Sequence, residues 1–311
     1  MTTSRKADEV LYATSPTAIP SLYLSRHGNF AAGMISGTLG RVLTTPLDVI
    51  KLFIQVGANG GSIIETTKDI YARKGIGGFW TGSTISVVNQ GFYSAIKFLI
   101  LREFASLKKG HVTDTSESTY ESAITGGIAG VISQAAVFPM DLVRTRIILN
   151  PDKYHTFFQT AAIIVKEEGF TALWSGLKPT VIGSIPYESS QYLVYSQLRQ
   201  RILKRTHKPL TSFQNAILGT AAGMISATIA YPFENLRKLM MCLDGEGKKK
   251  YSSMTKCLKH VMATEGISGL YHGVVLNAFK AIPYSALQFT LYDEVCHLFI
   301  KMKLYTKKDK I

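Results

Sequence analysis

The chain has 311 residues and a formal net charge of +14, with 46% hydrophobic but only 18% charged residues. Charged residues make up about 25% of ordinary soluble domains, so this composition favours a membrane protein. No HExxH, P-loop, GxSxG or CxxC motif occurs, and the 3 cysteines lack the spacing of metal ligands. We therefore expect neither an enzyme nor a bound metal or cofactor.

The first 27 residues contain Ser, Thr and Arg but also Asp8 and Glu9, and they include no apolar stretch like that of a signal peptide. We expect residues 1–27 and 304–311 to be flexible tails. The basic clusters RQRILKRTHK and KMKLYTKKDK are typical of segments close to anionic lipid. No DNA or RNA motif accompanies them, so the net charge does not predict a nucleic-acid partner.

A pattern of the form Pro-x-acid-x-x-base occurs three times, in TTPLDVIK, VFPMDLVR and AYPFENLR. Its prolines are evenly spaced, since 139 − 46 = 93 and 232 − 139 = 93. This period predicts three tandem repeats of about 93–97 residues. A GxxxG pair precedes each proline at the same distance, which predicts close helix packing on that face. These pairs are Gly33 and Gly37, Gly126 and Gly130, and Gly219 and Gly223.

Each repeat contains two long apolar segments joined by a loop with helical periodicity. We expect membrane helices at about 28–55, 85–107, 121–148, 178–203, 212–240 and 276–302. The loops IIETTKDIYARKG, FFQTAAIIVKEEG and MTKCLKHVMATEG predict three short amphipathic surface helices. The repeats then span residues 28–108, 120–203 and 212–303. The fold class is an all-α membrane protein.

The three motifs place prolines inside helices, where the missing N–H favours a kink. The prolines are Pro46, Pro139 and Pro232. Acid and base lie three residues apart, so one interpretation is a local pair within each helix, which contributes little when hydrated. The other is a ring of pairs between helices that closes one end of a cavity. The acids are Asp48, Asp141 and Glu234, and the bases are Lys51, Arg144 and Arg237.

A second shared signal follows each motif, in KGIGGFWTG, EGFTALWSG and EGISGLYHG. With this signal, the chain from about Phe30 to Lys303 resembles the mitochondrial carrier (solute carrier 25) family. The resemblance implies a pseudo-threefold bundle of six transmembrane helices with three short matrix helices. It also implies a monomer, located as a multi-pass protein in the mitochondrial inner membrane, that works by alternating access.

In family terms the ring is a matrix gate that pairs Asp48 with Arg144, Asp141 with Arg237, and Glu234 with Lys51. Gln55 matches the family's glutamine brace beneath one pair. The family holds cardiolipin phosphates on backbone N–H groups at the helix starts, which implies lipid sites at Gly82, Gly176 and Gly273. Here Lys74 replaces the usual acid before Gly75, and Thr81, Ser175 and His272 replace the usual base.

The opposite, cytoplasmic-side gate is incomplete in the sequence, because no full acid–base ring can be drawn on the even-numbered helices. Its candidates are Tyr195, Arg199, Tyr292 and Asp293. We expect this weak gate to favour a resting state that is open to the intermembrane space.

Substrate contacts are expected where the repeats differ, since a small asymmetric solute does not need three equal contacts. Arg41 and Lys280 match family contact positions and predict an anionic solute. Gly183 resembles the glycine with which nucleotide-type carriers leave room for a flat base. We expect an adenine nucleotide, coenzyme A or a similar cofactor; a smaller anion such as phosphate or a carboxylate is the alternative, and a non-transporting scaffold the less favoured one. The candidate contacts are Arg41, Asn89, Gln90, Gly183, Ser184, Tyr187 and Lys280.

Overall fold

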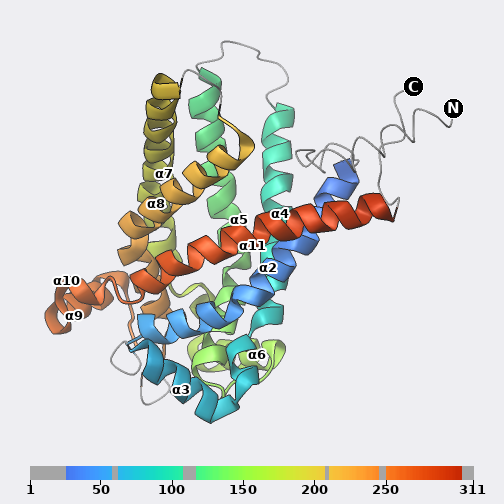
Figure 1. Ribbon diagram of the computed structural model, residues 1–311. Helices are drawn as coiled ribbons and strands as arrows, with labels where there is room; N and C mark the ends of the chain where they lie inside the picture. Colours follow the sequence, from blue (N-terminus) through green and yellow to red (C-terminus); the bar gives the residue numbers. More distant parts are fainter. Residues whose placement is uncertain (1–25, 58–61, 108–116, 207–209, 245–249, 303–311) are drawn as a thin grey trace. The chain divides into compact units, whose positions relative to one another are not determined.

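The computed structural model describes residues 26–57, 62–107, 117–206, 210–244 and 250–302 (Figure 1). The regular elements among these residues are all helical, and none of them is a β-strand. The tails predicted at 1–27 and 304–311 lie outside the described residues, except for Arg26 and His27, which begin the first helix.

Six long helices carry the repeats, and each end lies within four residues of its predicted position. Alternate helices contain the three motif prolines. The helices are α2 (Arg26–Gln55), α4 (Ser83–Leu107), α5 (Glu117–Leu149), α7 (Leu177–Thr206), α8 (Ser212–Met241) and α11 (Val274–Lys301).

Only some of these helices are apolar enough to qualify as membrane spans by hydropathy alone. Among the described residues, the stretches 76–104 and 125–149 meet that criterion. The other long helices carry too many polar and charged residues, and a charge inside a membrane segment normally faces the protein interior or a wet cavity. Hydropathy alone therefore undercounts the spans of a chain with a charged interior.

Three short helices occupy the loops, as the periodicity predicts: α3 (Ile63–Lys74), α6 (Phe157–Glu168) and α9 (Met254–Thr264). The hydroxyls of Ser62 and Ser253 accept from backbone N–H groups of the first turn and so cap α3 and α9. Gly75 and Gly169 end α3 and α6 with φ of 60° and 87°, a conformation that favours glycine. Short helices η3 (Ile76–Trp80), η5 (Phe170–Trp174) and α10 (Gly266–Gly269) follow.

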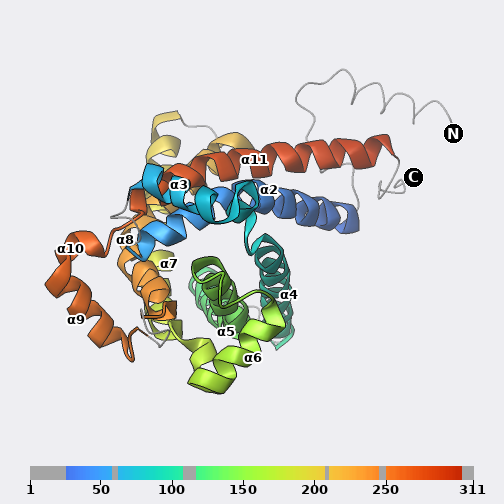
Figure 2. The same cartoon turned by 90° about the horizontal axis from the view of Figure 1, so that it is seen from below.

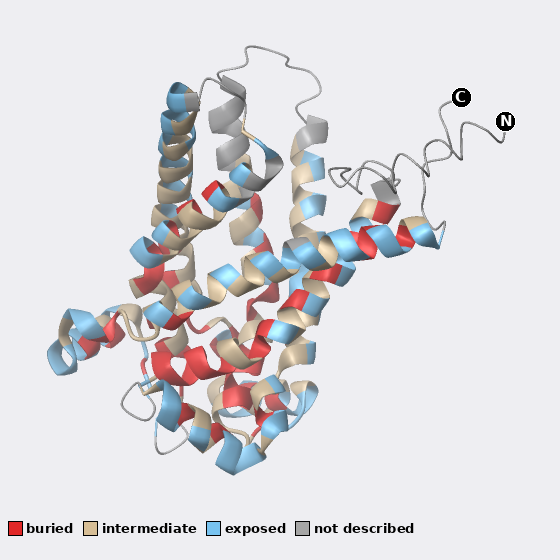
Figure 3. Cartoon of the chain, viewed as in Figure 1, coloured by how far each residue is buried: buried red, intermediate tan, exposed pale blue. Residues whose placement is uncertain are grey.

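The chain divides into two compact units, Met1–Gly40 with Tyr284–Ile311, and Arg41–Pro283. In the first unit, Ala32 packs with Val295, Cys296 and Phe299. In the second, α4 lies beside α5, and α7 lies beside α8 (Figure 2). One of the buried apolar clusters of this unit lies where α5 meets α6 and η5, with Phe138, Leu142 and Ile164 inaccessible (Figure 3).

The GxxxG pairs do not mark the closest helix contacts of the second unit, and of their four glycines there only Gly130 meets a neighbouring helix, with Tyr93 Oη 3.7 Å from an added Cβ. The prediction of close packing is therefore wrong for the other three. A Cβ added at Gly126, Gly219 or Gly223 would meet nothing within 4 Å. A Cβ added at Gly183 would instead lie 2.5 Å from Phe233 Cβ, where α7 crosses α8. The spacing shows which residues share a helix face, but it does not show whether a neighbouring helix covers that face.

Two tryptophans bond to the carbonyls that the motif prolines leave without a helical donor. Proline has no N–H, so the carbonyl four residues before it lacks its usual partner. Trp80 Nε1 donates to Val42 O at 3.0 Å, and Trp174 Nε1 donates to Ala135 O at 2.9 Å. Val42 and Ala135 each stand four residues before a motif proline. The third repeat has Tyr271 instead, whose ring stacks on Tyr231 at 6.3 Å.

A buried ion pair fixes α6 against the end of α5. Arg146 Nη1 and Nη2 donate to the two oxygens of Glu168 at 2.9 and 3.1 Å, and the Arg146 side chain is 0% exposed. The first repeat has Phe53 and Lys74 at these positions, and Phe53 is buried in an apolar cluster instead. This contact therefore differs between the repeats.

We predict that Trp174→Phe lowers the free energy of unfolding by about 1–3 kcal/mol, because it leaves the Ala135 carbonyl without a donor. The cost should shrink in a Pro139→Ala background, since residue 139 then supplies the helical N–H itself. Thermal unfolding of the four proteins of this cycle in detergent measures both effects. An equal cost in the two backgrounds would contradict the explanation.

We predict that Glu168→Gln lowers the free energy of unfolding by about 3–5 kcal/mol, because it leaves the buried Arg146 guanidinium without a counter-charge. The neighbouring Glu167→Gln is the matched control. Glu167 pairs with Lys153 at 2.6 Å with side chains 45% and 37% exposed, and such a pair contributes at most about 1 kcal/mol. Equal melting shifts for the two variants would refute this prediction.

Candidate functional site

The three motifs bring their charges together between helices rather than within them. Lys51 Nζ of α2 lies 2.6 Å from Glu234 Oε1 of α8. Arg237 of α8 bonds to Asp141 of α5. The third pair is looser, with Arg144 Nη2 of α5 4.0 Å from Asp48 Oδ2 of α2. These are the three pairs that the resemblance implies, and the alternative of local pairs within each helix does not describe the structure.

Two further lysines join this ring. Lys280 of α11 bonds to Asp48, the acid that Arg144 also approaches. Lys238 Nζ lies 3.1 Å from Asp141 Oδ2, the oxygen that Arg237 also contacts. Lys238 was not singled out from the sequence, although it directly follows a motif base and so lies at nearly the same depth.

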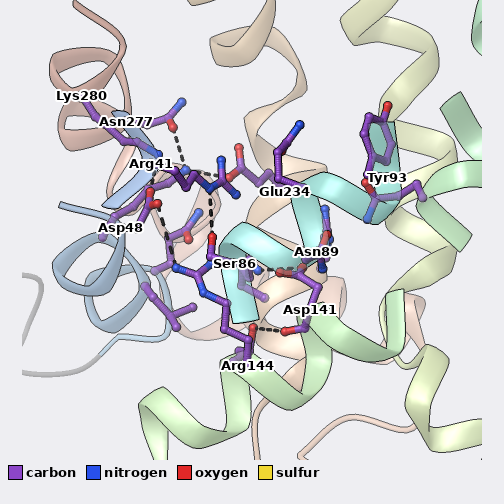
Figure 4. Close-up of a pocket in the computed structure, with 18 residues that line it drawn as sticks. Arg41, Asp48, Ser86, Asn89, Tyr93, Asp141, Arg144, Glu234, Asn277 and Lys280 are labelled. Atoms are coloured by element: carbon purple, nitrogen blue, oxygen red, sulfur yellow. Dashed lines mark hydrogen bonds and ion pairs between the residues drawn. The ribbon is translucent and has the colours of Figure 1, made fainter. Parts of the chain in front are cut away.

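A cavity of about 310 Å³ opens onto the ring, and it lies wholly within the second unit (Figure 4). Of the predicted substrate contacts, Arg41, Asn89, Gln90 and Lys280 line it. Arg41 Nε donates to Ser86 Oγ at 2.9 Å, and Asn89 Nδ2 donates to the Val137 carbonyl at 3.4 Å. Both bonds join residues of different helices.

The other three predicted contacts, Gly183, Ser184 and Tyr187, do not line this cavity. The space beside Gly183 is filled by Phe233, so no room is left there for a flat base. The Ser184 hydroxyl donates to the Val181 carbonyl of its own helix at 2.7 Å. The offset from the proline gives the depth of these residues, but the packing of α7 on α8 decides which face of α7 reaches the cavity.

The cavity lining carries a surplus of positive charge. It includes six bases and three acids, so its formal charge is 6 − 3 = +3. Amide side chains and the hydroxyl residues Ser86, Tyr93 and Thr145 complete the polar lining. The bases are Arg41, Lys51, Arg144, Arg237, Lys238 and Lys280, and the acids are Asp48, Asp141 and Glu234. An anion with several charges could enter without leaving the lining negative.

Gln55 does not bond to the acid–base pair above it, which corrects the predicted brace. Its Nε2 donates to Tyr231 Oη at 3.2 Å, and that hydroxyl donates to the His272 carbonyl at 2.8 Å. The place beside Lys51 is taken by Asn277, whose Oδ1 accepts from Lys51 Nζ at 2.7 Å. The amide therefore supports the ion-pair ring through Tyr231, whose aromatic ring centroid lies 5.4 Å from Lys51 Nζ.

The three glycines that precede α4, α7 and α11 have φ of 75°, 99° and 81°, which favours glycine. Each lies against the following motif helix in cyclic order. Gly82 O accepts from Arg144 Nε at 3.2 Å. A Cβ added at Gly176 would lie 2.9 Å from the Arg237 carbonyl of α8, and one at Gly273 would lie 3.3 Å from Gln55 Cγ of α2. Close packing beside the ring is therefore one reason for glycine at these positions.

The residues predicted for the opposite gate contact asparagines instead of forming acid–base pairs. In the second unit, Tyr195 Oη donates to Asn215 Oδ1 at 3.3 Å. In the first unit, Tyr292 Oη donates to Asn29 Oδ1 at 3.3 Å. Arg199 and Asp293 take part in no ion pair among the described residues of their own units. The asparagines lie on the motif helices α2 and α8, which the sequence pattern of the even-numbered helices could not indicate.

The described part of the chain contains no cluster of three or more His, Cys, Asp or Glu side chains that could hold a metal ion. Cys257 lies on the surface helix α9, and burial raises the pKa of its thiol to about 12. A thiol with so high a pKa stays protonated near neutral pH and is a poor nucleophile.

Comparison with known proteins gives the same three repeats. The mitochondrial carrier protein family matches residues 24–111, 115–206 and 208–303. An adenine nucleotide transporter of Arabidopsis thaliana is 28% identical over 265 residues, which cover 84% of this chain and 67% of the relative. A mitochondrial adenyl nucleotide antiporter of Danio rerio is 30% identical over 273 residues, 85% of this chain and 56% of the relative.

A mitochondrial thiamine diphosphate carrier of Zea mays is 29% identical over 310 aligned positions, which cover 85% of this chain and 91% of the relative. These relatives align with 84–85% of the chain, and the family match covers all three repeats. The chain therefore belongs to the mitochondrial carrier family of transporters, and it is a multi-pass helical protein of the mitochondrial membrane.

Proposed function

We propose that this chain moves an anionic, phosphorylated metabolite across the mitochondrial inner membrane by alternating access. The solute class is an adenine nucleotide, coenzyme A or a cofactor with a similar phosphate group. One observation carries the proposal: the cavity over the ion-pair ring is lined by six bases and three acids. The similarity to transporters of adenine nucleotides and of thiamine diphosphate supports it.

The neutral part of such a solute could bond to the amides of the lining. Asn89, Gln90, Gln134 and Asn277 all reach the cavity. A small anion such as phosphate or a carboxylate would leave most of these groups to water, which makes it the second candidate. A non-transporting scaffold would have no need of a complete ring of ion pairs between helices, and all three pairs are present.

The mechanism follows from the sharing of acids between bases. Lys280 bonds to Asp48, and Asp48 also holds Arg144 of the ring. An anion that binds Lys280 competes with Asp48 and thereby weakens the link between α11 and α2. A solute can shift the gate only by its difference in affinity for the two states, and this competition supplies such a difference. The weak tyrosine gate on the other side would favour a resting state open to the intermembrane space.

The proposal includes binding of a lipid phosphate and function as a monomer. Backbone N–H groups at the starts of α4, α7 and α11, after Gly82, Gly176 and Gly273, are available to a lipid phosphate such as that of cardiolipin. One chain contains all three repeats and therefore the whole ring, so a monomer suffices for transport.

We predict that purified protein in liposomes takes up labelled ADP, coenzyme A or thiamine diphosphate, and that the same solute raises its melting temperature. A solute that binds the folded state stabilises it by mass action, which makes thermal shift a first screen. Phosphate and malate serve as the comparison. Uptake and stabilisation by these small anions alone would favour the second candidate, and no uptake of any solute would favour the scaffold.

We predict that Lys280→Ala lowers uptake of the identified anion by about tenfold or more, because a charge-assisted hydrogen bond contributes about 1.5–3 kcal/mol. The variant should still fold, since Asp48 keeps Arg144 as a partner. Lys256→Ala on α9 is the matched control, because Lys256 is exposed and does not line the cavity. Unchanged uptake by a folded Lys280→Ala protein would remove Lys280 from the substrate site.

A further inference from the structure

Asp141 is shared by two bases of the same helix. Arg237 bonds to its Oδ2, and Lys238 Nζ lies 3.1 Å from that same oxygen. The Lys238 side chain is 14% exposed and belongs to the cavity lining. We call each carboxylate of the ring, together with the bases that it contacts, a corner of the ring. One carboxylate balances one positive charge, so the Asp141 corner carries a surplus base.

A second corner repeats this arrangement with bases from two helices. Asp48 bonds to Lys280 of α11 and approaches Arg144 of α5 at 4.0 Å. At the third corner Glu234 has Lys51 as its ion-pair partner, and Lys51 also donates to the neutral Asn277. The surplus over the ring is therefore located at two corners, those of Lys238 and Lys280.

Two ring arginines have buried N–H groups without an acceptor among the described residues. These groups are Nη2 of Arg144 and Nε of Arg237. Arg144 lies at the Asp48 corner and Arg237 at the Asp141 corner, and both line the cavity. A buried charged donor without an acceptor is costly, and an anion held at these corners would supply the missing acceptors.

We propose that Lys238 is a second anion ligand of the cavity, and that with Lys280 it selects a diphosphate group over a single phosphate. This inference rests on the proposed transport function and refines its substrate class. When the anion binds Lys238, that lysine leaves Asp141, and one of the two ion pairs that join α8 to Asp141 of α5 is lost. Lys238 therefore couples the charge of the solute to the opening of the ring.

The charge of the cavity lining also favours a diphosphate over a single phosphate. A phosphate monoester carries about 1.5–2 negative charges at pH 7, and it would leave part of the surplus at the two corners unbalanced. A diphosphate adds another charged phosphate and further acceptor oxygens. It can therefore match a lining whose formal charge is 6 − 3 = +3 more closely than a monophosphate can.

The test uses inorganic phosphate and pyrophosphate, which differ in charge and lack any organic part. Their dissociation constants are measured from the stabilisation of the purified full-length protein against ligand concentration. We expect wild type to bind pyrophosphate at least about tenfold more tightly than phosphate, and Lys238→Gln to lose about tenfold in affinity for pyrophosphate but little for phosphate. Comparison of two ligands on one variant cancels any effect of the substitution on the ligand-free protein.

Two further variants serve as controls. Lys238→Arg should keep the preference for pyrophosphate, because it keeps the charge. Lys259→Gln should also keep it, because Lys259 is an exposed residue of α9 that does not line the cavity. Three results would overturn the inference: no stabilisation of wild type by pyrophosphate, an unchanged preference in Lys238→Gln, or an equal loss of affinity for both ions.

The inference and the proposed function can fail separately. If pyrophosphate binding depends on Lys238 but liposomes take up no organic phosphate, the anion site stands and the transport proposal fails. If an organic phosphate is transported and Lys238→Gln leaves the preference for pyrophosphate unchanged, transport stands and this role of Lys238 fails.

Discussion

The site depends on one constraint, which is that three carboxylates hold together bases from neighbouring helices. Asp48, Asp141 and Glu234 each bond to a base on a different helix. Their charges would be costly to bury alone, so each needs a cation at the same depth. Because the bonds run between helices, any ligand that competes for a base also changes the contact between two helices. Binding and gating are thus properties of one group of side chains.

The prolines of the motif place a second demand on the structure. Each removes a helical hydrogen bond one turn before the ring, and in two repeats a tryptophan from the loop after the surface helix supplies a donor to the carbonyl left behind. The loop is thereby attached to the motif helix beside the ring. The glycines that follow allow the next helix to begin in close contact with the neighbouring motif helix. The recurring loop signal thus has a packing role beside any role in lipid binding.

The repeats agree in the ring and differ around it. The buried pair of Arg146 and Glu168 occurs in the second repeat, while Phe53 occupies an apolar cluster in the first. Surplus bases occur at the corners of Asp48 and Asp141, whereas Glu234 is balanced by Lys51. The three ion pairs of the ring, which recur in every repeat, hold the helices together. The surplus bases, which occur in only part of the ring, make the cavity asymmetric, and a small asymmetric solute can bind to them in one orientation. This division explains why the candidate substrate residues come from positions at which the repeats disagree.

The sequence by itself determined the three repeats and the six long helices, because even spacing and periodicity are properties of the chain. The partners within the ring followed from the family resemblance, since spacing and charge balance alone also allowed local pairs within each helix. The sequence also placed Arg41 and Lys280 at the right depth. Only the tertiary structure decided which helix faces meet. It filled the space beside Gly183 with Phe233, it bonded Gln55 to Tyr231 instead of to an acid–base pair, and it brought Lys238 to Asp141. Offsets along a helix give depth, but the rotation of each helix against its neighbours comes from packing between residues far apart in sequence.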